Sequence, residues 1–186
     1  MMRVIAGSAR SLQLKTPEGD NTRPTTDRVK ETLFNVLQND IPGCVFVDLF
    51  SGSGAIGIEA LSRGAQKAYF FEMDKTAIGC IEYNLKHTKL FDKALVFRQD
   101  AAAALSYGVR EEADVVFADA PYGQGFDEQV LISARNSKAV GPETIIVIEE
   151  KKERDLSDIA SALGFDIIKE KVYKTNKHIF FRRKEL

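Results

Sequence analysis

Apolar runs and segments of helical spacing alternate through most of the chain. Five short runs rich in β-branched and aromatic residues predict strands at 44–50, 67–74, 94–100, 113–121 and 143–150. Segments with apolar residues every three or four positions predict helices at 55–64, 75–88, 126–137 and 155–163. Two further runs, 165–173 and 177–183, are separated by only three residues and predict a hairpin.

This alternation is typical of an α/β fold. Strands joined by helices form βαβ units, whose strands lie parallel in one sheet. The hairpin at the end adds one strand that runs the other way. We therefore expect a Rossmann-like fold with a seven-stranded, mostly parallel sheet, a reversed last strand and helices on both faces.

The N-terminal part of the chain has a different pattern. Two short apolar runs, 2–7 and 11–17, predict a small β-hairpin, and a helix is predicted from about Asp27 to Gln38. We expect residues 1–20 to form an N-terminal β-hairpin extension and residues 21–186 to form the main domain.

The composition agrees with a globular protein that has a core of ordinary size. The 186 residues are 44% hydrophobic and 28% charged. No stretch approaches the roughly 20 apolar residues that cross a bilayer, and the first residues lack the apolar core of a signal peptide, so we expect a cytoplasmic protein. Cys44 and Cys80, like His87 and His178, show no spacing typical of a metal site.

The net charge of −1 conceals an uneven distribution. Residues 1–30 carry a net charge of +3 and residues 169–186 a net charge of +5, which leaves −9 for the middle of the chain. Basic ends on an acidic body are compatible with a local surface that binds an anion such as nucleic acid. They are equally compatible with solvated charges that only keep the chain soluble.

A glycine-rich turn follows the first strand of the main domain. Residues 52–57 read Gly-Ser-Gly-Ala-Ile-Gly, and Glu72 ends the next strand 20 residues after Gly52. Glycines let the backbone approach a ligand, the helix N-terminus presents free N–H groups, and the carboxylate can hold two ribose hydroxyls. This pattern fits NAD and S-adenosylmethionine equally well.

Three acidic positions favour S-adenosylmethionine. Asp48 lies four residues before Gly52, where a carboxylate would oppose a pyrophosphate but suits the ammonium group of a methionine moiety. Asp100 closes the third strand, where it can accept a hydrogen bond from an adenine amino group or can cap the segment 101–106. Asp119-Ala120-Pro121-Tyr122 follows the fourth strand, and no dehydrogenase requires that tetrapeptide.

Several motifs together resemble one enzyme family. VFVDLFSGSGAIGIEALSRGA, FFEMD, FRQDA and FADAPY are similar to successive motifs of Rossmann-fold methyltransferases that modify exocyclic amines. With RVIAGSARSLQLKTPEG and TRPTTDRVKETLFNVL, they more closely resemble the bacterial 16S rRNA guanine-N2 methyltransferases of the RsmD type. The likeness runs from about Arg3 to Tyr122, and the stretch from Thr22 to Leu37 is its most specific part, because general methyltransferases lack it.

The resemblance implies S-adenosylmethionine as the methyl donor, S-adenosylhomocysteine as its product, and no metal. The residues that it implies for the donor site are Arg23, Thr25, Asp48, Phe50, Ser51, Gly52, Ser53, Gly54, Glu72, Met73, Asp100, Ala101 and Asp119. The residues that it implies at the target base are Asp119, Ala120, Pro121 and Tyr122. Asp119 would orient the amine and accept its proton, and the ring of Tyr122 would stack on an extruded base.

One position departs from the family pattern. The family usually has two prolines in the catalytic tetrapeptide, and here the first is Ala120. The backbone carbonyl remains available as an acceptor, but the rigidity that proline gives to φ is lost.

The resemblance also implies an RNA partner. This would be 16S rRNA, within a small ribosomal subunit or an intermediate of its assembly, bound by a monomer that has no contact with membrane. The basic residues that we expect to contact phosphates are Arg3, Arg10, Lys15 and Arg28, with Arg182 and Arg183 as further candidates.

Other functions remain open at the level of the sequence. A DNA adenine or protein-glutamine methyltransferase uses a similar tetrapeptide, although the chain leaves no length for a separate target-recognition domain. An NAD-binding oxidoreductase would share the glycine turn. A non-catalytic RNA-binding module would explain the basic ends and tolerate Ala120.

Overall fold

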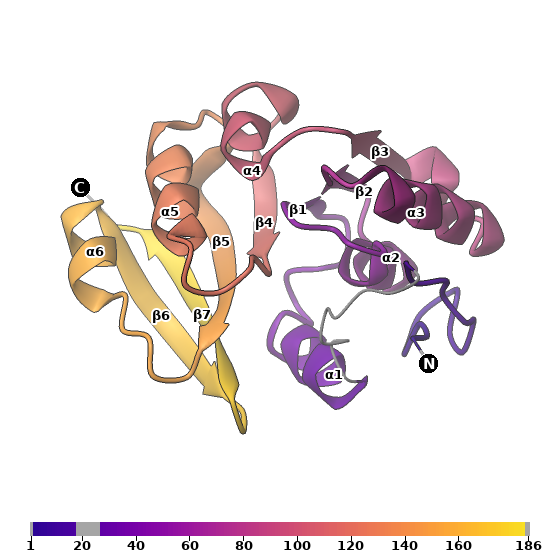
Figure 1. Cartoon of the computed structure of the whole chain (residues 1–186), viewed down its shortest axis with the longest axis horizontal. Coiled ribbons are helices and arrows are strands. Elements are labelled where there is room, and N and C mark those ends of the chain that lie inside the picture. Colours follow the sequence, from indigo (N-terminus) through magenta and orange to yellow (C-terminus); the bar gives the residue numbers. More distant parts are fainter. Residues whose placement is uncertain (1, 18–26, 185–186) are drawn as a thin grey trace.

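The computed structural model describes residues 2–17 and 27–184, and a seven-stranded sheet runs through its centre (Figure 1). The strands lie in the order β3-β2-β1-β4-β5-β7-β6, from β3 at the right of Figure 1 to β6 at the left. Their bounds are β1 Val45–Asp48, β2 Lys67–Phe71, β3 Ala94–Phe97, β4 Ala113–Ala118, β5 Val140–Lys151, β6 Phe165–Val172 and β7 Asn176–Arg183.

The directions of the strands confirm the predicted sheet. β1 pairs in parallel with β2 and β4, β2 with β3, and β4 with β5. β7 is antiparallel to both of its neighbours, β5 and β6, so the last strand is the reversed one. Its place beside β5 follows from the tight turn after β6, which lets β7 fold back between the two.

Helices cover both faces of the sheet, as predicted. They are α1 Asp27–Val36, α2 Ala55–Ser62, α3 Lys75–His87, α4 Ala101–Ala103, α5 Phe126–Asn136 and α6 Ser157–Ala162, with a 3-10 turn η1 at Phe91–Lys93 and a π-helical turn η2 at Ala104–Gly108. None of the helices in the described ranges is long and apolar enough to cross a membrane.

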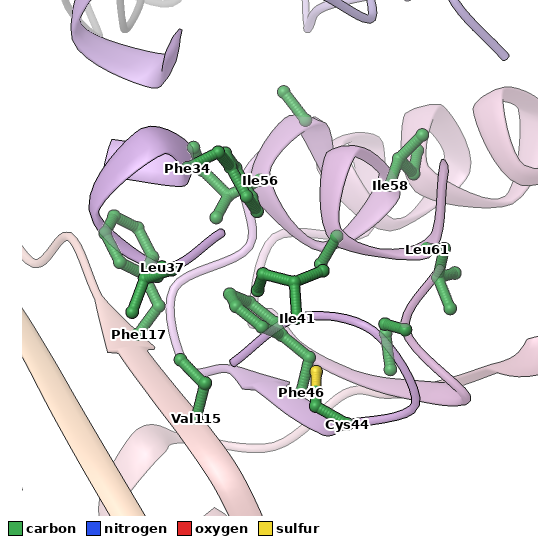
Figure 2. Close-up of a cluster of buried hydrophobic side chains, with 14 of the residues drawn as sticks. Phe34, Leu37, Ile41, Cys44, Phe46, Ile56, Ile58, Leu61, Val115 and Phe117 are labelled. Carbon is green, nitrogen blue, oxygen red and sulfur yellow. The ribbon is translucent and has the colours of Figure 1, made fainter. Parts of the chain in front are cut away.

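The side chains of β1 show how the sheet separates two cores. Phe46 packs with side chains of α1, α2 and α3, and Figure 2 shows it among Phe34, Ile58 and Phe117. Val45 and Val47 point to the opposite face and pack with side chains of α4, α5 and α6. A strand buried on both faces is therefore apolar at every position except its last, Asp48.

The N-terminal segment folds back on itself but forms little β-structure. Arg3 and Gln13 form one antiparallel bridge, and the amides of Val4, Ser11 and Leu14 donate to the carbonyls of Leu12, Val4 and Met2 at 2.9 to 3.0 Å, but no named strand forms there, so the full predicted hairpin is not confirmed. The turn between the two runs bonds to α2: the amide of Ala9 donates to Ser62 Oγ at 2.9 Å, and the amide of Ser8 to the Ser62 carbonyl at 2.8 Å. The segment is thereby packed on the main domain.

Glu59 of α2 joins the N-terminal segment to the helices. Its side chain is fully buried and accepts hydrogen bonds from the amides of Ile5 and Ala6, at 2.8 and 3.0 Å. It also forms ion pairs with Lys30 of α1, at 3.2 Å, and with Arg63, at 2.8 Å. A carboxylate is buried at low cost only when all its acceptor sites are used. Since the partners of Glu59 come from the N-terminal segment and from α1, its bonds hold both of them against α2.

Lys30 completes the connection to α1. It is also fully buried, and besides Glu59 its Nζ donates to the backbone carbonyl of Arg3. Burial lowers the pKa of Lys30, and the Glu59 carboxylate counteracts that effect. One of the positive charges at the basic N-terminal end is therefore not available to a partner.

We expect Glu59→Ala to lower the free energy of unfolding by about 3–5 kcal/mol, because it leaves Lys30 buried without its carboxylate. Urea denaturation measures this. The control is Glu153→Ala, which breaks the exposed pair of Glu153 with Lys152 and should cost less than about 1 kcal/mol. Equal losses in the two variants would contradict the role given to Glu59.

Candidate methyl-donor and acceptor site

The sheet order places two carboxylates side by side. From β1 the chain passes outward to β2 and β3, and it then returns to β4 on the other side of β1. Ligands of open α/β sheets bind at the carboxyl ends of the strands where the order reverses in this way. Asp48 is the last residue of β1 and Asp119 follows the last residue of β4, so both lie at this point.

Asp48 is a buried carboxylate without a partner. It is 1% exposed, and neither side-chain oxygen has a hydrogen-bond partner within the described residues. Burial raises its pKa to about 7, the nearby amides of Gly57 and Phe50 offset part of that effect, and the charge of Glu72 adds to it. Burying this unpaired carboxylate costs free energy in the protein without ligand. The position therefore suits a ligand that brings a positive charge or hydrogen-bond donors to Asp48.

The glycine turn that follows Asp48 has open space beside Gly52. Gly52 and Gly54 have φ values of 52° and 79°, which side chains rarely tolerate. No atom lies within 4 Å of where a Cβ on Gly52 would be, so backbone conformation, not crowding, requires glycine there. Ser51 holds the turn, since its Oγ donates to the Asp48 carbonyl at 3.0 Å and accepts from the Phe71 amide at 3.1 Å.

Glu72 is already attached to the turn. Its Oε2 accepts from the Gly52 amide at 2.9 Å, and its Oε1 accepts from the amides of Met73 and Asp74 at 2.7 and 2.9 Å. A carboxylate has about four acceptor sites, so these three bonds fix its orientation and leave little unused capacity. Its role toward a ribose stays a prediction, as does that of the exposed Met73.

The remaining predicted donor-site residues lie around the same edge. Asp100 is exposed and accepts from the Ala103 amide at 2.9 Å, so it does cap the short helix α4, the alternative that the sequence allows. Ala101 is buried, and Phe50 packs against Phe126 with ring centroids 5.5 Å apart. Arg23 and Thr25, with Pro24 between them, lie outside the described residues.

Ser53 connects the turn to the N-terminal segment. Its carbonyl accepts from Asn84 Nδ2 at 2.9 Å, and the same amide nitrogen donates to the Lys15 carbonyl at 2.8 Å. Asn84 Oδ1 accepts from the Lys15 amide at 2.7 Å. Sequence reasoning overlooked Asn84, because nothing in the pattern of α3 distinguishes it from a solvated residue.

The tetrapeptide after β4 meets a cluster of carboxylates. Burial raises the pKa of Asp119 well above its usual range, and the charges of Glu149, Asp48 and Glu150 add to this effect. The side chain still keeps some exposure to solvent, so a substrate could reach it. Ala120 is buried and Pro121 is exposed.

Tyr122 is half-buried and bonded to β5. Its hydroxyl donates to Glu149 Oε1 at 2.8 Å. Glu149 also accepts from Asn176 and His178 of β7. These three residues were not predicted as part of the site, since only the pairing of β5 with the reversed strand β7 brings them to Tyr122.

A hollow of about 500 Å³ begins just beyond the tetrapeptide. Gly123, Gly125, Asp127, Glu128, Glu150, Lys151, Glu153 and Arg154 line it. Its lining comes from the loop after the tetrapeptide, the start of α5, the end of β5 and the segment that follows β5. No group of three or more histidine, cysteine, aspartate or glutamate side chains suitable for a metal ion occurs in residues 2–17 and 27–184.

The four basic residues predicted first for RNA contact are at the surface. Arg3, Arg10, Lys15 and Arg28 are exposed, although Arg3 forms an ion pair with Asp27 at 2.8 Å. Arg183 is different, because it donates to the carbonyls of Ala134, Arg135 and Ser137 and so closes the C-terminal end of α5.

Solved structures agree with the class that the fold and the site define, which is a Rossmann-like methyltransferase. The Escherichia coli protein yhhF covers 100% of this chain and 99% of its own, with a TM-score of 0.84 and 31% identity. A ribosomal protein L11 methylase from Lactobacillus delbrueckii, at 13% identity, shares the fold alone, with a TM-score of 0.70 over 94% of this chain and 84% of its own.

Sequence relatives place the chain within this class. The family model described as "Conserved hypothetical protein 95" matches residues 2–182. "Ribosomal RNA small subunit methyltransferase D" of Haemophilus influenzae is 37% identical over 83% of this chain and 81% of its own, and the Escherichia coli protein of the same name is 34% identical over 92% and 84%. The chain belongs to this family, the RsmD-type methyltransferases, which confirms the resemblance.

We expect Asp48→Asn to stabilise the free protein, and increasingly so as the pH rises. The folded-state pKa of about 7 lies above the unfolded value, so stability contributed by the proton on Asp48 is complete at pH 4 and is lost as the pH rises through 7. Denaturation at pH 5 and pH 8 measures the free energy of unfolding of both proteins. The difference in favour of the variant should be roughly 2–4 kcal/mol larger at pH 8 than at pH 5. An unchanged difference would mean that Asp48 is not an unpartnered buried acid.

Proposed function

We propose that this protein transfers a methyl group from S-adenosylmethionine to the exocyclic N2 of a guanine in 16S rRNA. The observation that carries the proposal is the pair of carboxylates at the β1/β4 switch point, one buried without a partner and one within reach of solvent. Membership of a family whose named relatives are ribosomal RNA small subunit methyltransferases supports the choice of substrate.

The residues at the switch point fit this donor. Asp48 would receive the methionine ammonium group, which supplies the charge and the donors that its side chain lacks. The open Gly52 backbone would allow close approach, and Glu72 and Asp100 would meet the ribose and the adenine. When bound, the donor supplies a methyl group on an electrophilic sulfonium sulfur.

The tetrapeptide supplies the acceptor side. Asp119 and the carbonyl of Ala120 would accept hydrogen bonds from the two N–H groups of the guanine amine, which directs the nitrogen lone pair toward the methyl group. Such alignment accounts for several kcal/mol of the barrier, within the roughly 7–11 kcal/mol of ideal intramolecular reactions. The ring of Tyr122 would hold the base by stacking, a contact that contributes about 1–3 kcal/mol per base elsewhere.

Asp119 would then take the proton that the methylated nitrogen releases. The raised pKa of Asp119, which burial and the neighbouring carboxylates cause, makes its ionised form a stronger base than a solvated carboxylate. Orientation of the amine comes first, since the methylated nitrogen is acidic enough to lose its proton to water as well.

RNA contacts outside the site must offset the energy of extruding the base. Unstacking and unpairing cost a few kcal/mol, and contacts of basic residues with phosphates can supply this. Arg3, Arg10, Lys15 and Arg28 would do so from the N-terminal segment and α1, in a cytoplasmic monomer that acts on the small ribosomal subunit or an assembly intermediate.

The proposal is tested by incubating the protein with methyl-labelled donor and small subunits or 16S rRNA from a methylation-deficient strain. We expect label at N2 of a single guanine. Label on an adenine or on protein would refute the acceptor assignment while leaving the donor assignment intact, and binding of NADH without binding of S-adenosylhomocysteine would refute both.

We expect Asp119→Asn to lower kcat by at least about 100-fold while S-adenosylhomocysteine binds within a few-fold of its wild-type affinity. In the wild type, kcat should rise with pH through a midpoint above the usual carboxyl range near 4, because ionised Asp119 is the stronger hydrogen-bond acceptor for the amine and can also take its proton. Single-turnover rates over a pH series check this. A variant that keeps the wild-type rate and pH profile would exclude Asp119 from the chemistry.

We expect the double change Arg10→Gln and Lys15→Gln to weaken RNA binding and to reduce the slope of log K against log salt by about 2, with kcat at saturating RNA unchanged. Binding titrations at several salt concentrations measure the slope. The control is Lys138→Gln, an exposed residue just before the amino-terminal end of β5. A control slope that falls by about 1, the same change for each charge removed, would show that the charge effect is not local.

A further inference from the structure

A buried carboxylate outside the catalytic tetrapeptide collects three hydrogen bonds. Glu149, near the end of β5, is 7% exposed. Its Oε1 accepts from the Tyr122 hydroxyl at 2.8 Å and from Asn176 Nδ2 at 2.6 Å, and its Oε2 is 3.0 Å from His178 Nε2. These bonds outweigh the effect of burial and lower the pKa of Glu149, so it carries a charge at neutral pH.

The reversed strand holds this carboxylate from the far side. Glu149 and His178 are directly opposite each other in the pairing of β5 with β7. His178 is fully buried, its Nδ1 is 3.0 Å from the Tyr173 hydroxyl, and its ring packs edge-on against Phe117 of β4. The imidazole is therefore fixed on both nitrogens, and it can neither rotate nor release Glu149 without breaking a second bond.

Tyr122 differs from the other residues bonded to Glu149. Asn176 and His178 belong to the sheet, whereas Tyr122 lies on the loop that carries Asp119. A buried charge contributes little to stability compared with apolar packing, but it fixes the orientation of the groups bonded to it. Burial, and then the charge of Glu149, raise the pKa of Tyr122, so its hydroxyl remains a donor to Glu149 at physiological pH.

Ala120 makes the hydrogen bond from Tyr122 to Glu149 more important for the loop. The alanine lacks the ring that would fix φ at position 120, so the backbone between Asp119 and Tyr122 is held by one proline, Pro121, where the family usually has two. The hydrogen bond from Tyr122 to Glu149 attaches the end of the tetrapeptide to β5 three residues after Asp119. It therefore adds, from outside the loop, a restraint where the loop has one proline fewer.

We infer that Glu149 is a positioning residue of the methyl transfer, which holds the Tyr122 ring where the target base stacks and is itself held by Asn176 and His178. The inference rests on the proposed function, since it assumes that a base lies against Tyr122. Its effect should appear in kcat, because a misplaced ring leaves the base bound but poorly aligned with the methyl group.

A double-mutant cycle tests whether Glu149 acts through Tyr122. We expect Glu149→Ala and Tyr122→Phe each to lower kcat by about 10-fold or more, with KM for RNA within about 3-fold and donor-product affinity unchanged. The double variant should be no slower than Glu149→Ala alone, because both changes remove the same hydrogen bond. Glu149→Gln, which keeps an acceptor for the hydroxyl, should restore kcat to within about 3-fold of the wild type.

The chain offers a matched control. The Tyr69 hydroxyl also donates to a carboxylate, Glu111 Oε1, at 2.7 Å, but far from the tetrapeptide. Tyr69→Phe and Glu111→Ala should leave kcat unchanged. Losses that multiply in the Glu149→Ala/Tyr122→Phe variant, or a Glu149→Gln variant as slow as Glu149→Ala, would overturn the inference.

A spectroscopic experiment distinguishes a failure of this inference from a failure of the proposed function. In protein labelled with ¹³C at tyrosine Cζ, the Tyr122 signal is identified by its loss in Tyr122→Phe. We expect it to move toward the position of free tyrosine in Glu149→Ala, whether or not RNA is methylated. An unmoved signal would refute the contact, whereas a moved signal in a protein that methylates no 16S rRNA would refute only the proposed function.

Discussion

The parallel pairing of β1 with β2 on one side and β4 on the other is the constraint on which the site depends. It brings Asp48 and Asp119, 71 positions apart in the chain, to one edge at the point where the strand order reverses. Burial raises the pKa of both carboxylates, and neighbouring charges add to the effect: Glu72 at Asp48, and Glu149 and Asp48 at Asp119. The apolar packing on the two faces of β1 keeps both carboxylates in place. The stability of the sheet therefore offsets the free-energy cost of burying two acidic groups at an edge suited to chemistry.

Two buried glutamates attach segments outside the sheet to the elements around it. Glu59 fastens the N-terminal segment and α1 to the helix that starts after the glycine turn. Glu149 fastens the tetrapeptide to β5 and β7 on the acceptor side. Both accept several hydrogen bonds, as a buried carboxylate must, and each acts between elements that are distant in sequence. Asp48 is the exception, since neither of its side-chain oxygens has a partner among the described residues, and this unused acceptor capacity is what supports the binding role that we propose for it.

The sequence predicts what depends on local pattern. The mostly parallel sheet of seven strands, its reversed last strand, the helices on both faces and the places of Asp48, Gly52 and Asp119 at the ends of strands follow from apolar periodicity and chain connectivity, and the structure has them. What depends on tertiary contacts could not be foreseen. Lys30 reads as a surface charge but is buried on Glu59, His178 has no motif around it, and the turn between the two N-terminal runs bonds to Ser62 of α2. Asp100 satisfies a local rule, capping, that leaves its predicted contact with adenine untested.

A crystal structure of the protein with S-adenosylhomocysteine tests the central claim most directly. The account predicts that the amino group of the ligand lies within hydrogen-bond distance of Asp48, that its ribose lies at Glu72, and that its sulfur faces Asp119 across the switch point. A ligand bound elsewhere, or bound at this edge with Asp48 still lacking a partner, would contradict it.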